Sequence, residues 1–272
     1  MEKEVFTLKG AYGDEKVFVS RLSPKDSVGK VIVLFHGVHG CASVHEGNKY
    51  AVLARMLLPL GLTVYLTETS RLRRDRDSFK EDRDRWARTA FQGKTYGMDL
   101  YDVCVALSEI EKRHPTEEIY LWGFSLGGIH SLMIAGGGYQ TKLREGGFPQ
   151  PVFSVSPSGI IVSGSGDSID KDDVSTTLRL PILDTIGDNA LLYKSVRSIK
   201  TGWFVSFYGE NDNTFSEEAC RRLFDAADIP EKKQFIIIPG ADHAFRRLYG
   251  LPSIEPLKRM VSYLGPFFDN RN

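Results

Sequence analysis

Short apolar runs alternate along the chain with longer segments in which apolar residues recur every three to four positions. The short runs predict β-strands, and the periodic segments predict α-helices. The run at residues 31–35 has five consecutive apolar residues, which is typical of a strand covered on both faces. Strands that alternate with helices imply right-handed crossover connections and a mostly parallel sheet.

Eight strands are expected, at residues 5–8, 16–20, 30–35, 62–66, 119–122, 151–155, 203–208 and 234–238. The first two suit an antiparallel pair at the sheet edge, because the glycine-containing residues 10–14 favour a hairpin. Helices are expected at about 47–58, over the segment after Gly97 whose periodic apolar residues run from Leu100 to Ile110, at 128–135, at 188–199, after Thr214 and at 255–264. Thr214 and Glu217 have the spacing of a capping box. Residues 156–187 show no clean period.

The fifth predicted strand runs directly into Gly-Phe-Ser-Leu-Gly, residues 123–127, and then into a helix-compatible segment. A serine at the apex of such a tight turn needs a positive φ, and glycines at positions 123 and 127 remove side chains that would collide with the neighbouring strand and helix. This strand–turn–helix pattern is that of a nucleophile elbow. It would hold the Ser125 hydroxyl out of the fold, beside helix N–H groups that could stabilise an oxyanion.

Three polar residues directly follow predicted strands or their end loops: Ser125, Asp212 and His243. Because the carboxyl ends of parallel strands meet at one edge of a sheet, these side chains are expected to converge. A serine hydroxyl needs a base to become a nucleophile, imidazole serves as that base near neutral pH, and a carboxylate orients the imidazole. Glu210 and Asp242 are alternative carboxylates.

The order Ser, Asp, His, the elbow, the His-Gly-Val-His-Gly loop at 36–40 and the strand pattern resemble the α/β-hydrolase superfamily, in its serine esterase-like form. The resemblance covers nearly the whole chain, from Val5 to the last helix. It implies one α/β-hydrolase domain over residues 1–272, with an eight-stranded, mostly parallel sheet and helices on both faces. A lid insertion is implied after the sixth strand, at about 156–187. The oxyanion hole is expected from the backbone N–H groups of Val38 and Leu126.

This resemblance implies a serine hydrolase, most simply a carboxylesterase of small to medium esters, that works through an acyl-enzyme intermediate and needs no cofactor or metal. Ser125 would attack the acyl carbonyl, His243 would accept and return the proton, and Asp212 would orient His243. An amidase or peptidase, a thioesterase and an acyltransferase use the same triad. A non-catalytic ligand-binding relative is the alternative outside enzymes.

Composition and charge narrow the range of partners. The 35 basic and 35 acidic residues cancel, which argues against nucleic acid or an anionic membrane as the main partner. No run reaches the roughly 18 apolar residues that span a bilayer, and no apolar segment follows the first residues as in a signal peptide. A cytoplasmic location is therefore expected. The three cysteines suggest neither a disulfide framework nor a zinc site.

The stretch from Arg71 to Arg88 carries eight basic and five acidic residues. It could be a solvated face held by local pairs of opposite charge. Alternatively, one arginine could reach the site and bind an anionic group of the substrate.

The loop after the third strand contains two histidines. His36 is expected to be structural, whereas His39 could face substrate or solvent.

Overall fold

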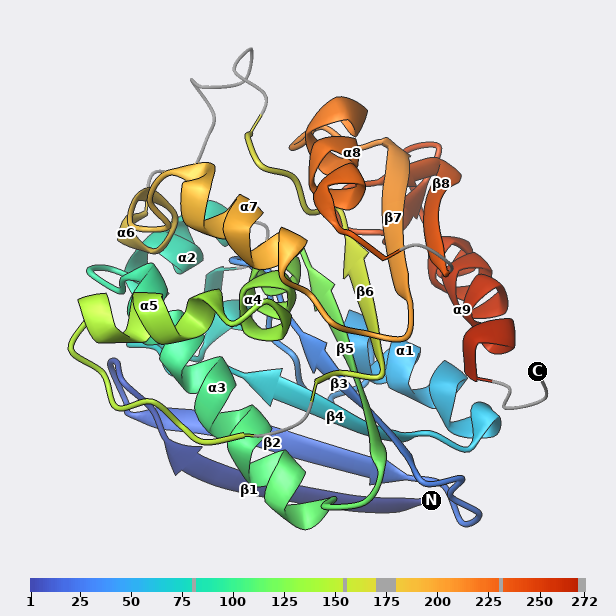
Figure 1. The fold of residues 1–272 in the computed structure, drawn as a ribbon, viewed down its shortest axis with the longest axis horizontal. Helices are drawn as coiled ribbons and strands as arrows, with labels where there is room; N and C mark the ends of the chain where they lie inside the picture. Colours follow the sequence, from blue (N-terminus) through green and yellow to red (C-terminus); the bar gives the residue numbers. More distant parts are fainter. Residues whose placement is uncertain (80–81, 154–155, 170–179, 230–231, 269–272) are drawn as a thin grey trace.

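A computed structural model describes residues 1–79, 82–153, 156–169, 180–229 and 232–268 (Figure 1). Their strands form one sheet in the order β1-β2-β4-β3-β5-β6-β7-β8-β9-β10. The strands are β1 (Glu2–Lys9), β2 (Lys16–Ser23), β3 (Lys30–Phe35), β4 (Thr63–Glu68), β5 (Glu118–Phe124), β6 (Gly159–Ser163), β7 (Phe204–Asn211), β8 (Lys233–Asp242), β9 (Arg247–Leu248) and β10 (Leu251–Pro252). The six strands from β4 to β8 in this order pair in parallel, so the carboxyl ends of β3, β5, β6, β7 and β8 share one edge.

The edge strands pair antiparallel. β1 pairs with β2, and β2 pairs with β4. This arrangement confirms the predicted hairpin at the amino terminus. At the other edge, the two-residue strands β9 and β10 extend the sheet beyond β8. The described residues therefore form eight longer strands, as the sequence pattern predicts, and two short ones that it does not.

Helices cover both faces of the sheet (Figure 1). Val31, Val33 and Phe35 of β3 pack in a core that includes α3, α4, α5, α7 and α8 residues, whereas Ile32 and Leu34 face the opposite core, with α1 and α9. The helices are α1 (Lys49–Leu57), α2 (Arg83–Ala90), α3 (Tyr96–Arg113), α4 (Leu126–Ala135), α5 (Gly138–Glu145), α6 (Pro181–Asp184), α7 (Asn189–Arg197), α8 (Glu217–Ala226) and α9 (Glu255–Phe268), with 3-10 helices η1 (Leu58–Leu60) and η2 (Arg76–Phe79). Among the described helices, none combines the length and the apolar character required to cross a bilayer.

The sixth strand lies later in the chain than the sequence pattern predicts. The expectation of a strand at 151–155 is wrong, because residues 151–153 are irregular and Val152 is 82% exposed; residues 154 and 155 lie outside the described residues. The strand is β6, whose three central residues Ile160, Ile161 and Val162 are buried between β5 and β7. Part of the expected lid at 156–187 is thus a central strand.

Two further local predictions need correction. Helix α5 was not expected, because three consecutive glycines, residues 136–138, stand at its start and only Tyr139 and Leu143 bury apolar side chains. Helix α8 begins after Ser216 rather than after Thr214, because the Ser216 hydroxyl accepts the hydrogen bond of the Ala219 amide at 3.2 Å. The expected capping box is therefore absent, and the amide of Thr214 bonds elsewhere.

Candidate functional site

Ser125 occupies the turn between β5 and α4, with φ 54° and ψ −120°. Its amide donates to the carbonyl of Ser163 at 2.9 Å, and its carbonyl accepts from the Ser165 hydroxyl at 2.8 Å. Both flanking glycines are required by close packing: a Cβ at Gly123 would lie 2.0 Å from the Gly127 carbonyl oxygen, and a Cβ at Gly127 would lie 2.4 Å from a β3 carbonyl oxygen. The strained positive φ is thus held by backbone packed on both sides.

Asp212 and His243 directly follow β7 and β8 and contact each other. Asp212 Oδ2 lies 2.8 Å from His243 Nδ1. The other carboxylate oxygen, Oδ1, accepts from the amides of Thr214 at 2.8 Å and Phe215 at 3.0 Å. The Asp212 side chain is fully buried, whereas 21% of the His243 side chain is exposed. The carboxylate is therefore fixed by three hydrogen bonds, and the imidazole reaches the surface of a cavity.

The two alternative carboxylates bond elsewhere. Glu210 Oε2 accepts from the amide of Gly240 at 2.8 Å. Asp242 Oδ1 accepts from the amides of Arg246 at 2.7 Å and Arg247 at 3.0 Å, so it closes the turn that follows His243. Of the three candidates, only Asp212 forms a hydrogen bond with the imidazole among the described residues.

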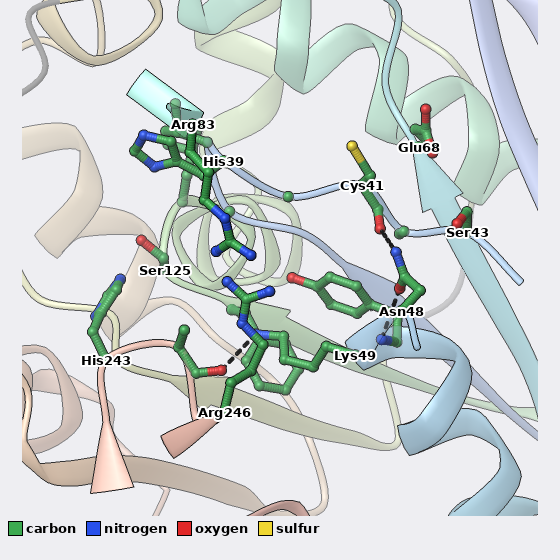
Figure 2. A pocket seen from close by; sticks show the side chains of 18 of the residues that line it. His39, Cys41, Ser43, Asn48, Lys49, Glu68, Arg83, Ser125, His243 and Arg246 are labelled. Atoms are coloured by element: carbon green, nitrogen blue, oxygen red, sulfur yellow. Dashed lines mark hydrogen bonds between the residues drawn. The ribbon is translucent and has the colours of Figure 1, made fainter. Parts of the chain in front are cut away.

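Ser125 and His243 line the same cavity of about 1320 Å³. Figure 2 shows both on the same side of this cavity. Val38, from the loop after β3, and Leu126, the first residue of α4, line it as well. The structure therefore brings together the five residues that the sequence analysis assigned to the site, four at the cavity wall and Asp212 behind His243.

Gly164, directly after β6, is a member of the site that the sequence analysis missed. Its φ is 56°, and a Cβ there would lie 3.1 Å from His243 Nδ1 and 3.2 Å from Asp212 Oδ2. Any larger residue would press on the contact between carboxylate and imidazole. The signal in the sequence is the Ser-Gly-Ser-Gly run at 163–166, which marks a strand end only once β6 is correctly placed.

Several solved structures superimpose on this chain. The esterase domain of a Rhodothermus marinus protein does so with a TM-score of 0.64 and 18% identity over 98% of both chains. An α/β serine hydrolase without lid from Xanthomonas campestris has a TM-score of 0.58 and 15% identity over 98% of this chain and 93% of its own. For a dienelactone hydrolase homologue from Klebsiella pneumoniae the values are 0.65 and 14% over 98% of both chains. The chain has the α/β-hydrolase fold. No protein-family model matches the sequence, and no curated protein matches it.

The two histidines of the loop after β3 of this α/β-hydrolase fold differ in environment. His36 is buried, with Nδ1 2.8 Å from the carbonyl oxygen of Gly37 and Nε2 accepting from the Thr69 amide at 3.3 Å. Burial lowers the pKa of His36 to about 4. These contacts agree with the structural role predicted for it. His39 lines the cavity, and its Nε2 lies 2.9 Å from Asp84 Oδ1 of α2.

The basic stretch from Arg71 to Arg88 divides between the two interpretations. Arg73 pairs with Asp75 at the surface, as expected of a solvated face. Arg71 is fully buried, and its guanidinium lies 3.2 Å from Cys41 Sγ. Lys80 lies outside the described residues. Three of the described basic residues of this stretch line the cavity: Arg74, Arg76 and Arg83.

Lys49, the first residue of α1, also lines the cavity and was not singled out by the sequence analysis. Its ammonium group donates to the Ala244 carbonyl at 3.1 Å and lies 3.9 Å from the ring centre of Phe124. Burial lowers the pKa of Lys49 to about 7, an effect that the nearby Asp242 carboxylate opposes and the Arg83 guanidinium reinforces. A lysine at the start of a helix carries no sequence signal that distinguishes it from a surface lysine.

The described residues contain no group of three or more histidine, cysteine, aspartate or glutamate side chains arranged to hold a metal ion. The cysteine nearest the site, Cys41, lines the cavity as a free thiol. The side chains gathered at the cavity include the hydroxyl of Ser125, the imidazole of His243 with the Asp212 carboxylate behind it, and several cationic groups.

Proposed function

We propose that this chain is a serine hydrolase that cleaves carboxylic esters with small to medium acyl or alcohol groups. The observation that carries the proposal is the 2.8 Å contact of Asp212 with His243 at the cavity that Ser125 also lines. Ser125 attacks the acyl carbonyl carbon, and His243 takes the proton of its hydroxyl. The same proton then passes to the departing alcohol, and water releases the acyl group from Ser125.

The orientation of the imidazole supports this division of roles. With Nδ1 bonded to the buried carboxylate of Asp212, the proton on Nδ1 is retained and Nε2 keeps its lone pair for the Ser125 proton. The amides of Val38 and Leu126 are the proposed donors to the tetrahedral oxyanion. Val38 belongs to the loop after β3, and Leu126 is the first residue of α4, directly after Ser125. Preorganised amides of this kind stabilise the charge that develops in the transition state.

The segment that follows β6 supports a pocket for a substrate with apolar parts. Described residues on both sides of 170–179 line the cavity, among them Ile169, Leu183 and Ile186. We therefore assign residues 166–169 and 183–187 as one wall of the substrate pocket within a single domain, whereas residues 170–179 of the expected lid lie outside the described residues. Apolar side chains there would bury the acyl or alcohol chain of an ester.

Labelling with a fluorophosphonate tests the nucleophile. The wild type and a Ser43→Ala variant, which changes another serine that lines the cavity, are expected to become labelled on Ser125, whereas Ser125→Ala should not. Ser125→Ala should also lower the rate of ester hydrolysis by a factor on the order of 10⁶. Retained turnover in that variant would refute the assignment.

A panel of para-nitrophenyl esters of graded chain length, with matched amides and thioesters, tests the reaction class. Esters of short and medium acyl chains are expected to have the highest kcat/KM. Faster turnover of the amides or thioesters, or transfer of the acyl group to an added alcohol in preference to water, would replace the esterase assignment. A labelled but inactive wild-type protein would do so as well.

A further inference from the structure

Two cationic side chains, those of Lys49 and Arg246, line the cavity close to the backbone segments that carry the proposed catalytic residues. Lys49 donates to the carbonyl of Ala244, which follows His243, and its ammonium group lies over the ring of Phe124, which precedes Ser125. Arg246 is three residues beyond His243, and its own backbone amide is held by Asp242. The Lys49 side chain is therefore held against the backbone segments of the proposed base and nucleophile, and Arg246 belongs to the turn that follows the base.

Neither side chain has an acidic partner within ion-pair distance in the described part of the chain. Asp242 acts on Lys49 only at longer range. Figure 2 shows the guanidinium groups of Arg246 and Arg83 pointing toward one another into the cavity. Arg83 also acts electrostatically on Lys49. Like charges that converge in a partly enclosed space repel one another, and an anion placed among them would remove that repulsion.

The acidic residues that line the cavity are otherwise engaged or exposed. Three of them contact basic side chains: Asp84 with His39, Glu68 with Arg74, and Asp167 with Arg222. The other two, Glu46 and Asp77, are exposed. In total, six lysines and arginines and five acidic residues of the described chain line the cavity. This near balance suits a ligand with a single negative charge better than one with two.

We propose that the substrate is an ester that carries a second, free carboxylate group, and that Lys49 and Arg246 bind this carboxylate. The inference rests on the proposed esterase function and specifies its substrate class. A planar guanidinium can donate two parallel hydrogen bonds to a carboxylate, and the ammonium group of Lys49 adds a third charged donor. The cavity of about 1320 Å³ has room for a chain between the ester and the carboxylate.

The test compares two esters that differ only at the distal carboxyl group: mono-para-nitrophenyl glutarate, which has a free carboxylate, and its methyl-capped counterpart. For the wild type, kcat/KM is expected to be at least about tenfold higher for the free acid, as one or more charge-assisted hydrogen bonds predict. Added sodium chloride should reduce this ratio, because part of the attraction is electrostatic.

Two variants assign the effect to the residues. Arg246→Gln and Lys49→Met are each expected to lower the free-acid to capped-ester ratio by about ten- to hundredfold, mainly through KM. Arg247→Gln is the matched control, since Arg247 is adjacent in sequence but does not line the cavity. It should keep the wild-type ratio. Circular dichroism of each variant checks that the fold is retained.

A wild-type ratio of one or less, or an unchanged ratio in both Arg246→Gln and Lys49→Met, overturns the inference. If capped esters are still cleaved in a Ser125-dependent manner, the esterase proposal survives that result. Inhibition by glutarate and by inorganic phosphate separates two anion classes: stronger inhibition by phosphate would replace the carboxylate with a phosphate group. Binding of glutarate to Ser125→Ala, followed by calorimetry, reports on the anion site even where hydrolysis is absent.

Discussion

Replacement of Asp212 by asparagine is expected to disable the imidazole of His243 without disturbing the turn around it. Oδ1 of Asp212 accepts hydrogen bonds from the amides of Thr214 and Phe215 at 2.8 and 3.0 Å. In Asp212→Asn, these two donors hold the amide oxygen in the same place. The NH₂ group must then take the position of Oδ2, which lies 2.8 Å from His243 Nδ1.

This geometry determines the size of the effect. An NH₂ group at that position donates to Nδ1, so the imidazole proton moves to Nε2 and the ring can no longer accept the proton of Ser125. The wrong tautomer is expected to lower kcat about 10⁴-fold, or about 5.4 kcal/mol of transition-state stabilisation. The free energy of unfolding should fall by about 1–2 kcal/mol, because the three hydrogen bonds of the carboxylate become hydrogen bonds of a neutral amide and lose their charge assistance.

The assay is steady-state hydrolysis of para-nitrophenyl butyrate, with urea unfolding to measure stability. Glu210→Gln and Asp242→Asn are matched controls, because both remove a nearby carboxylate charge that does not contact the imidazole. Each control should retain kcat within about tenfold of the wild type. An Asp212→Asn enzyme that remains within tenfold of the wild type, or a control that loses as much as Asp212→Asn, would refute the reasoning.

Three further predictions concern packing and protonation. Gly127→Ala is expected to abolish ester hydrolysis and to lower the melting temperature, because the added Cβ would lie 2.4 Å from the Phe35 carbonyl oxygen. An active variant with the melting temperature of the wild type would contradict this packing argument. Like His36, His130 of α4 is buried. As pH falls from 6.5 to about 4, the free energy of unfolding is expected to decrease, because burial lowers the pKa of both histidines to about 4 and only the unfolded chain takes up their protons in this window. Each histidine contributes at most about 3 kcal/mol to that decrease. Urea titrations should therefore show a shallower pH dependence of the unfolding free energy for His130→Phe than for the wild type. Identical pH dependences of the two proteins would count against a role of His130. Burial lowers the pKa of Lys49 to about 7, so Lys49 should lose its charge as pH rises above that value. The KM for mono-para-nitrophenyl glutarate should therefore increase above that pH in the wild type but not in Lys49→Met. Parallel KM profiles of the two proteins would exclude this titration.

The sequence alone was sufficient for the features that depend on neighbouring residues. Unbroken apolar runs such as 31–35 predict doubly covered strands, and the glycines two residues either side of Ser125 predict the sharp turn, because φ/ψ preferences and side-chain volume act locally. The positive φ of Ser125 agrees with that expectation. The α/β class, and the convergence of the residues that follow the parallel strands at one edge of the sheet, follow from the order of these local elements.

Only the tertiary structure could choose among residues that are locally equivalent. Residues 151–155 and 159–163 both have strand composition, and burial between β5 and β7 selects the second. Asp242 is adjacent to His243 in the chain, and Asp212 follows the neighbouring strand β7. In the fold, only Asp212 forms a hydrogen bond with the imidazole, whereas Asp242 accepts from the amides of the turn after His243. Lys49 becomes part of the cavity wall because helix α1 packs there. Desolvation and contact between distant segments are properties of the assembled molecule, so no local pattern in the chain encodes them.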